Sequence, residues 1–262
     1  MAEVQYEKRD HVALIILNRP EKRNAWTFRM QDLLQEIWAD FRDDPDIWVG
    51  VVTGAGESAF CAGQDIQELS DLLKKDAFRL GEGFWSLTGR NSLMTDEKIY
   101  KPVIAAINGH CLGIGLTLAM SCDIRLASSK ATFGFPEVKI GVPTVMGALK
   151  MPRLIAMGAA LELLLVGDPI GAEEAKSWGL INRIYEPGSV KDEAMKLAQR
   201  MCRNGPLAMN VTKEIAIRGH QLPFDDAWRL GEALRRLAMD SMDFREGLQA
   251  FLEKRSPKFR GR

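Results

Sequence analysis

Short apolar runs alternate with helical patterns along the first half of the chain. Four runs have the length of a β-strand and are apolar almost throughout: 12–17, 49–53, 103–107 and 124–127. After Thr27, which can act as an N-cap, apolar side chains recur at helical spacing and predict a helix that continues to about Phe41. Strand, helix and strand in this order indicate βαβ crossovers, and therefore a largely parallel, buried sheet.

The pattern becomes helical after about Gly158. Six helices are predicted there: 158–166, 172–178, 189–203, 206–218, 224–240 and 243–254. One strand signal, 180–185, interrupts them. We therefore expect an α/β core over residues 1–195 and a helical C-terminal part over 196–262, which is too thin to fold alone and packs against neighbouring subunits. Residues 69–100 are the least regular stretch, and we expect them to form a mobile cover.

Composition narrows the classes of function. The chain has 262 residues, of which 46% are hydrophobic and 27% charged, as in an ordinary globular protein. Lys and Arg together number 35 and so do Asp and Glu, so the formal net charge is zero. A dedicated nucleic-acid or membrane-surface protein needs a surplus of cations, so the balance disfavours both, but it does not disfavour a small anionic ligand.

The cysteines and the apolar runs indicate the cellular compartment of the protein. Four cysteines, Cys61, Cys111, Cys122 and Cys202, form no C-x-x-C pair and have no metal-ligand spacing, so we expect reduced thiols and no metal site. The first ten residues do not read as a signal peptide, and no uncharged apolar stretch is long enough for a membrane helix. These observations predict a cytoplasmic protein without a membrane anchor.

Three loops place backbone groups or a carboxylate where a strand leads into a helix. In the first, residues 58–66, Gly63 permits an unusual turn and Asp65 can cap the helix that follows. The N–H of Gln64 would then point into the crevice beyond the carboxyl ends of the strands, where α/β proteins bind ligands. An ordinary βα turn is the alternative interpretation.

In the second loop, residues 108–116, Gly113 and Gly115 open a very apolar helix. Its first N–H groups lack intrahelical partners and would stabilise a negative oxygen. The loop has neither G-x-G-x-x-G nor the lysine of a P-loop, so it is not a nucleotide fingerprint. Together, the N–H groups near Gln64 and Ile114 suggest an oxyanion hole with two donors.

The third loop, residues 133–143, embeds Glu137 among apolar side chains. This carboxylate is either a structural charge paired with Lys139 or a general acid/base tuned by desolvation. Of the histidines, only His110 lies in a glycine-rich loop where it could contact a ligand. His11 and His220 have no carboxylate or cysteine partner in the sequence around them.

The three loops, in this order and spacing, resemble the crotonase (enoyl-CoA hydratase/isomerase) superfamily. Further blocks extend the resemblance over essentially the whole chain: 18–25 (NRPEKRNA), 59–65 (AFCAGQD), 101–109 (KPVIAAING), 122–123 (CD), 133–137 (FGFPE), 172–182 (AEEAKSWGLIN) and 250–255 (AFLEKR). The resemblance implies an α/β fold built as a spiral of ββα units with a helical C-terminal part. It also implies a homotrimer or a dimer of trimers that acts on an acyl-CoA.

The resemblance also implies roles for particular residues. The N–H groups of Gln64 and Ile114 would bind the thioester carbonyl, and Glu137 would be the acid/base. Coenzyme A, present as part of the substrate and with no prosthetic group beside it, would be bound by residues from four segments: Lys22, Arg23, Ala25, Ala62, Asp65, Ile66, Leu112, Phe251 and Lys254. The acyl pocket would be lined by Thr117, Phe135, Pro136 and Val142.

Two departures from the family pattern affect the predicted reaction. Thr117 stands where hydratases of the family typically carry a first glutamate, and Ile114 replaces a glycine, so that its side chain narrows the acyl site. Two carboxylates share the proton transfers of hydration easily, whereas one suffices to move a double bond. One carboxylate can also serve hydration if it takes a proton from water and passes it onward, so Glu137 alone suits an isomerase at least as well as a hydratase. Within the resembled family, we expect hydration of a 2-enoyl-CoA, or the reverse dehydration. The alternatives are an enoyl-CoA isomerase, an acyl-CoA hydrolase and a non-catalytic acyl-CoA-binding relative.

The neutral charge is an average over unlike parts of the chain. Residues 254–262 hold five cations and no acid, which leaves 30 cations against 35 acids in the remaining 253 residues. This tail is either a solvated end or a cationic edge that meets the phosphates of CoA, across a subunit boundary as in the resembled family. An RNA-binding relative would need a basic stripe with interleaved aromatics, which this mixed-charge sequence disfavours.

Overall fold

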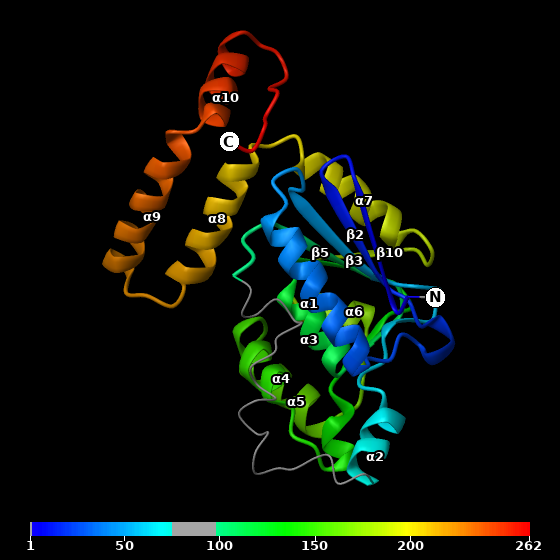
Figure 1. Ribbon diagram of the computed structural model, residues 1–262. Coiled ribbons are helices and arrows are strands. Elements are labelled where there is room, and N and C mark those ends of the chain that lie inside the picture. The colour runs from blue at the N-terminus through cyan, green and yellow to red at the C-terminus, as the bar shows by residue number, and fades with distance from the viewer. Residues whose placement is uncertain (1, 75–97) are drawn as a thin grey trace.

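A six-stranded sheet forms the centre of the molecule (Figure 1). The computed structural model describes residues 2–74 and 98–262. The strands of the large sheet, in spatial order, are β1 (Val4–Arg9), β2 (Val12–Leu17), β3 (Val49–Gly54), β5 (Val103–Ile107), β7 (Ile124–Ser128) and β10 (Arg183–Tyr185). All neighbours from β2 to β10 are parallel, and only β1 runs antiparallel, at the edge. The predicted parallel sheet is confirmed.

Both faces of this sheet are covered around β2, β3 and β5, which explains why these three strands are apolar almost throughout. In β5, Val103, Ala105 and Ile107 face the larger core, together with buried residues of α1 (Phe28–Asp43). The alternate residues Ile104 and Ala106 face a second core, which α7 (Val190–Met201) closes. Burial on both sides fixes the register of the strands, because a slip of one residue would exchange the two faces.

A second, smaller sheet carries the turns that matter for function. Its strands, in spatial order, are β4 (Ala59–Cys61), β6 (His110–Leu112), β8 (Thr132–Gly134) and β9 (Ile170–Gly171). The first three are parallel, and each follows directly on a strand of the large sheet: β3, β5 and β7, respectively. After them come α2 (Ile66–Lys74), α3 (Ile114–Ser121) and the 3₁₀ helix η2 (Pro136–Ile140) with α4 (Val145–Lys150). This succession is the predicted spiral of ββα units.

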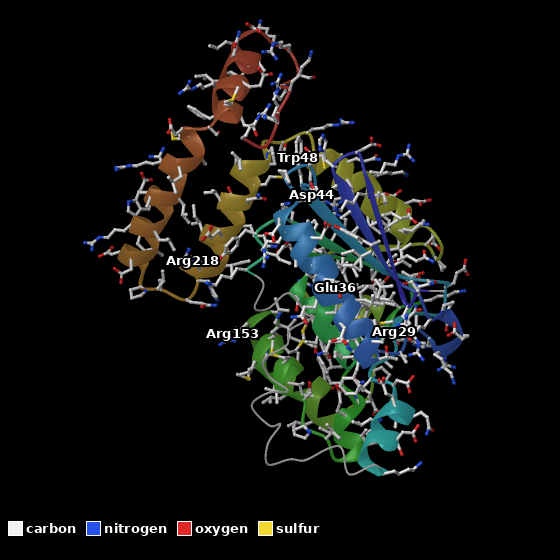
Figure 2. All side chains as sticks on the ribbon, in the orientation of Figure 1. Arg29, Glu36, Asp44, Trp48, Arg153 and Arg218 are labelled. Atoms are coloured by element: carbon white, nitrogen blue, oxygen red, sulfur yellow. The ribbon has the colours of Figure 1, made fainter. Side chains whose placement is uncertain are left out.

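The remaining helices close the core and then leave it. They are the 3₁₀ helices η1 (Pro20–Lys22) and η3 (Met151–Arg153), and the α-helices α5 (Met157–Val166), α6 (Ala172–Ser177), α8 (Pro206–Gly219), α9 (Phe224–Met239) and α10 (Met242–Leu252). The last three extend away from the body, and α10 lies at the opposite end of the molecule from α2, α4 and α5 (Figure 1). Charged side chains such as Arg153 and Arg218 project outward into solvent (Figure 2).

Two sequence expectations need correction at the level of elements. The strand predicted over 180–185 is only Arg183–Tyr185, because Leu180 N–H still bonds to Ala175 O and so closes the turn after α6. The antiparallel edge strand β1 was not predicted because its sequence is mostly polar and exposed. The strands of the small sheet were not predicted because runs of two or three residues carry no periodic signal. The cover expected over 69–100 falls largely on residues 75–97, which lie outside the described residues.

No disulfide, metal site or membrane-spanning helix is found in the described part of the chain. Cys61, Cys111 and Cys122 are buried, as expected, and all four cysteines are free. Within residues 2–74 and 98–262, no three metal-ligating side chains gather into a potential metal site. Over the same residues, no helix has both the length and the apolar character needed to cross a membrane.

Candidate active site

Three loops meet at the carboxyl edge of the small sheet. Gln64 follows β4, Ile114 follows β6 and Glu137 follows β8, within three residues of each strand end. A Cβ atom on Gly113 would lie 2.9 Å from Glu137 Oε1 and 3.6 Å from Gly63 Cα. The three loops that the sequence singled out are therefore brought together at one point.

Two glycines make this convergence possible. Gly63 has a φ of +104° and Gly113 a φ of +53°, in the region that L side chains rarely adopt. Because Gly113 has no Cβ, the carboxylate of Glu137 can pack directly against its backbone. A side chain at residue 113 would displace the one charged group of the described cavity lining.

The backbone orients two N–H groups toward the same cavity. Trp26 N–H donates to Gly63 O and Asp65 N–H donates to Trp26 O, each at 2.8 Å, so the N–H of Gln64 turns away from Trp26. Ile114 is the first residue of α3, so its N–H has no acceptor within the helix. In the described part of the chain neither N–H has a backbone acceptor, and both residues line the cavity.

Close packing seats α3 on the small sheet. A Cβ on Gly115 would lie 2.6 Å from both the Cβ and the carbonyl oxygen of Cys61, so only glycine permits this approach. The contact joins the first turn of α3 to the end of β4. It therefore fixes the Ile114 loop relative to the Gln64 loop.

Glu137 is a desolvated carboxylate, and no cation pairs with it in the described part of the chain. Burial raises the pKa of its side chain above the ordinary value, and its Oε2 atom is buried without a hydrogen-bond partner. The Lys139 ammonium pairs instead with Asp168, at the surface. The interpretation of Glu137 as a structural charge paired with Lys139 is thus wrong, and a group available for proton transfer remains.

A cavity of about 560 Å³ opens beside this carboxylate, within the range of ligand pockets, roughly 300–1,000 Å³. Of its described lining residues, Glu137 alone carries a charge. The lining residues are Phe28, Ala62, Gly63, Gln64, Ile66, Leu69, Gly113, Ile114, Thr117, Pro136, Glu137, Ile140, Val142, Pro143, Thr144, Val145 and Met146. Eight of these were predicted site residues: Ala62, Gln64, Ile66, Ile114, Thr117, Pro136, Glu137 and Val142.

Phe135 does not line the cavity, contrary to the prediction. Its side chain is fully buried, and a Cβ on Gly147 would lie 2.8 Å from its ring. The ring therefore supports α4 from behind. Leu112 is likewise absent from the lining, because it lies within β6.

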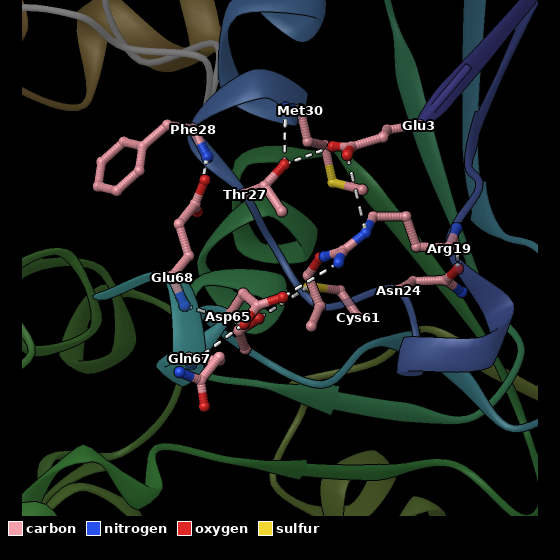
Figure 3. A network of polar contacts seen from close by, with 12 residues as sticks. Glu3, Arg19, Asn24, Thr27, Phe28, Met30, Cys61, Asp65, Gln67 and Glu68 are labelled. Carbon is pink, nitrogen blue, oxygen red and sulfur yellow. Dashed lines mark hydrogen bonds and ion pairs between the residues drawn. The ribbon is translucent and has the colours of Figure 1, made fainter. Parts of the chain in front are cut away.

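Asp65 does not line the cavity, and its carboxylate belongs to a network of hydrogen bonds beside α2 (Figure 3). Its carboxylate accepts the N–H groups of Gln67 and Glu68, at 3.1 and 3.3 Å, which confirms that it caps α2. It also accepts a hydrogen bond from Arg19 at 3.1 Å. These bonds favour its ionised form, and the pKa of Asp65 is lowered despite the opposing effect of burial.

The network around Arg19 was not predicted as part of the site. The guanidinium donates to Ala25 O at 2.6 Å and pairs with Asp65 and Glu3, while the Glu3 carboxylate also accepts the Thr27 hydroxyl (Figure 3). Arg19 thereby holds the loop before α1 beside the loop before α2. An arginine next to a proline in a turn is the only local signal for this role.

The predicted CoA-binding residues fall into two groups. Lys22, the last residue of η1, and Arg23, which follows it, are exposed. Arg23 O accepts the N–H of Ala62 at 3.1 Å, so this turn and Ala25 lie at the edge of the cavity. Phe251 and Lys254, by contrast, lie exposed on and just after α10, at the far end of the same chain (Figure 1). Neither residue lines the cavity of its own chain.

Comparison with known proteins places this site in a family. The sequence model of the enoyl-CoA hydratase/isomerase family matches residues 7–262. Two relatives are each 37% identical to this chain. The (E)-benzylidenesuccinyl-CoA hydratase of Thauera aromatica aligns over 98% of this chain and 99% of its own. The crotonyl-CoA hydratase of Syntrophomonas wolfei aligns over 97% and 96%.

Solved structures agree with the sequence comparison. An enoyl-CoA hydratase from Bacillus anthracis superimposes with a TM-score of 0.90 at 32% identity, over 99% of this chain and 100% of that chain. An enoyl-CoA hydratase from Mycobacterium marinum gives a TM-score of 0.89 at 33% identity, with all of both chains covered. By sequence and by fold, the chain belongs to the enoyl-CoA hydratase/isomerase family.

Proposed function

We propose that this protein adds water to 2-enoyl-CoA thioesters, or catalyses the reverse dehydration. Relatives named as hydratases support the reaction class. The observation that carries the proposal is the desolvated carboxylate of Glu137, packed against Gly113 between two loops whose N–H groups lack backbone acceptors. Such a group beside an oxyanion hole suits proton transfer next to a thioester.

The chemistry follows from these groups. The N–H groups of Gln64 and Ile114 bind the thioester oxygen and draw electron density from C3 of the enoyl chain. The Glu137 carboxylate takes a proton from water, and the hydroxide adds to C3. The resulting enolate is stabilised by the two N–H groups, and Glu137 returns its proton to C2. One carboxylate thus completes the addition, and no prosthetic group is needed for acid–base chemistry of this kind.

A double-bond isomerase is the second candidate. Thr117, where a second acid would be expected, is 3% exposed and its hydroxyl donates to Gly113 O at 3.3 Å. Glu137 is then the one acid/base among the described lining residues, and carrying a proton between C2 and C4 needs no more. Hydrolysis of the thioester would instead require water to attack the carbonyl carbon.

One assay separates these reactions. The protein is incubated with a conjugated 2-enoyl-CoA, and products are followed by mass spectrometry, absorbance of the conjugated thioester and thiol release. Hydration adds the mass of one water and removes the chromophore, isomerisation leaves the mass unchanged, and hydrolysis releases CoA thiol. A mass gain of one water is expected; unchanged mass with a shifted double bond would replace the hydratase assignment by the isomerase.

The role of Glu137 is tested by Glu137→Gln. We expect turnover to fall by about 10²–10⁴-fold, since a general acid/base contributes that much. Binding of a saturated acyl-CoA, measured by calorimetry, should stay within a few-fold of wild type because the cavity keeps its shape. Turnover at the wild-type rate would exclude Glu137 as the acid/base.

We further propose a homotrimer, or a dimer of trimers, in which α10 of one copy contributes Phe251 and Lys254 to the CoA site of the next. The exposure of these residues and their distance from the cavity of their own chain support this arrangement (Figure 1). The turn at Lys22–Ala25 would bind the adenine and phosphates, with Ala62 beside it. Three buried free thiols support a reducing compartment such as the cytoplasm.

A further inference from the structure

A lysine joins the two helices that border the cavity. Lys150 is the last residue of α4, and its Nζ donates to the hydroxyl of Ser121, the last residue of α3, at 2.6 Å. Ser121 in turn donates to Thr117 O at 2.9 Å. Thr117 lines the cavity on the α3 side, and Val145 and Met146 line it on the α4 side. The chain of hydrogen bonds therefore spans the two walls.

The surroundings of Lys150 are unusual for an ammonium group. No carboxylate pairs with it in the described part of the chain, and the titratable groups that act on it are the Cys122 thiol and the Arg125 guanidinium. Arg125 is itself committed to Cys122 O, at 2.8 Å, and Leu180 O, at 2.6 Å. Burial lowers the pKa of Lys150 to about 8. An ammonium that is desolvated without a counter-ion is costly to place, so its compensation lies in the bond to Ser121 and in the negative end of α3.

A second contact fixes the middle of α4. Gly147 is buried, and a Cβ there would lie 2.8 Å from the Phe135 ring and 2.7 Å from Thr144 Oγ1. Phe135 supports α4 from behind, and Lys150 ties its last turn to α3. The first turn of α4, which faces the cavity, is thus held from two points outside the cavity.

We propose that Lys150 is a positioning residue that holds α4 against α3 and thereby limits the length of acyl chain that the cavity accepts. The inference rests on the proposed acyl-CoA function. Without the tether, the last turn of α4 loses its hydrogen bond to α3, and the cavity-lining turn can tilt outward. The cavity then gains room for further methylene groups, each of which adds about fourfold to binding when buried.

The test uses equilibrium binding, which does not depend on the reaction catalysed. Dissociation constants for butyryl-, hexanoyl-, octanoyl- and decanoyl-CoA are measured by calorimetry on the wild type and on Lys150→Met, Lys150→Arg and Ser121→Ala. We expect Lys150→Met and Ser121→Ala to shift the decanoyl-to-butyryl affinity ratio about fifteenfold toward the longer chain. Lys150→Arg, which keeps the charge and donors, should stay within about twofold of wild type. These values follow from room for two methylene groups.

The matched control is Lys196→Met, which removes an exposed lysine of α7 and should leave the ratio unchanged. A general loss of stability would weaken all four ligands alike, whereas the proposal predicts a change in their ratio. An unchanged ratio in Lys150→Met would overturn the proposal; if that variant does not fold, Ser121→Ala decides in the same way. A wild type that binds none of the four thioesters would instead contradict the proposed function.

Discussion

At the scale of single residues, the site combines a carboxylate whose ionised form is disfavoured by burial with two glycines, Gly113 and Gly115, where a Cβ atom would clash with neighbouring residues. Glu137 lies against Gly113 at a distance that excludes a Cβ, and its Oε2 atom is without a partner. A structural carboxylate would be expected to have a cation or N–H donors around it, as Asp65 does. The two acids therefore differ in environment: Asp65 is held by donors, whereas Glu137 is desolvated, as the proposed acid/base role requires.

The pH dependence of turnover tests the environment of Glu137. Burial raises the pKa of this carboxyl above its ordinary value of 4.5, and the proposed mechanism needs the ionised form. Turnover should therefore fall as the pH decreases through the raised pKa, so that the acid limb of kcat/KM has its midpoint above 4.5. The measurement is kcat/KM for an enoyl-CoA from pH 4.5 to 9 in buffers of constant ionic strength. A midpoint at or below 4.5 would show that this carboxylate is not desolvated in the free enzyme.

Sequence reasoning located Gln64, Ile114 and Glu137 because each has a local signal, a glycine or proline just beyond the end of a strand. It misplaced Phe135 because the orientation of that ring depends on Gly147, on a helix that forms later in the chain. It also predicted that Asp65 binds the ligand, because its actual partner, Arg19, is 46 residues away in the sequence. Local backbone geometry could be predicted here, whereas partners distant in sequence could not.

At the scale of elements, α3 has one end at the cavity and the other end in contact with two cationic side chains. Its N-terminus faces the cavity, while Arg125 and Lys150 bind the carbonyl of Cys122 and the hydroxyl of Ser121 at its other end. Cations at the C-terminal end and an oxyanion at the N-terminal end both complement the helix dipole. The four long parallel strands β2, β3, β5 and β7 of the large sheet were predicted within one residue because they are mostly apolar.

The packing contact between α3 and β4 is tested by Gly115→Ala. The added methyl group would lie 2.6 Å from Cys61, so α3 must shift and move the Ile114 N–H away from its place beside Gln64. We expect kcat to fall by about 10²-fold or more, comparable to the loss of one oxyanion donor. The readout is steady-state kinetics on protein whose circular dichroism matches wild type.

Gly158→Ala is the matched control for that variant. Gly158 lies in the first turn of α5, and a Cβ there would meet nothing within 4 Å. It should leave kcat unchanged and raise the free energy of unfolding by about 0.5–1 kcal/mol. Full activity in Gly115→Ala would refute the assignment of the α3–β4 contact to the oxyanion hole.

At the scale of the whole molecule, the C-terminal helices expose large apolar side chains. Trp228 is 62% exposed, Leu237 72% and Phe251 80%, and no residue of α9 is buried. Apolar surface of this extent on a folded chain indicates an interface. The division of the chain into a core over 1–195 and a helical part over 196–262 remains a prediction, and the projection of α8, α9 and α10 agrees with it (Figure 1).

Assembly is tested by Leu237→Glu. A charge placed in an apolar interface should dissociate the oligomer, which light scattering after size-exclusion chromatography detects as a smaller mass. Because Phe251 and Lys254 would then no longer reach a neighbouring cavity, binding of an acyl-CoA should weaken about tenfold, the loss of one moderate contact. Lys196→Glu, on α7, changes charge outside α8–α10 and serves as the control. A monomeric wild type, or a dissociated variant that binds acyl-CoA as well as wild type, would contradict the shared site.

The delivery of Gln64, Ile114 and Glu137 by successive ββα units has an evolutionary consequence. Each of these residues is held by the strand ends of its own unit, whereas the wall formed by Val145 and Met146 belongs to α4, which leaves the sheet. Substitutions at Val145 and Met146, which line the cavity, can accumulate without a change in the turns that carry Gln64, Ile114 and Glu137. Acyl preference can therefore diverge among descendants of one gene while these turns are retained, and a mutant library confined to Val142, Val145 and Met146 is the economical place to redirect it.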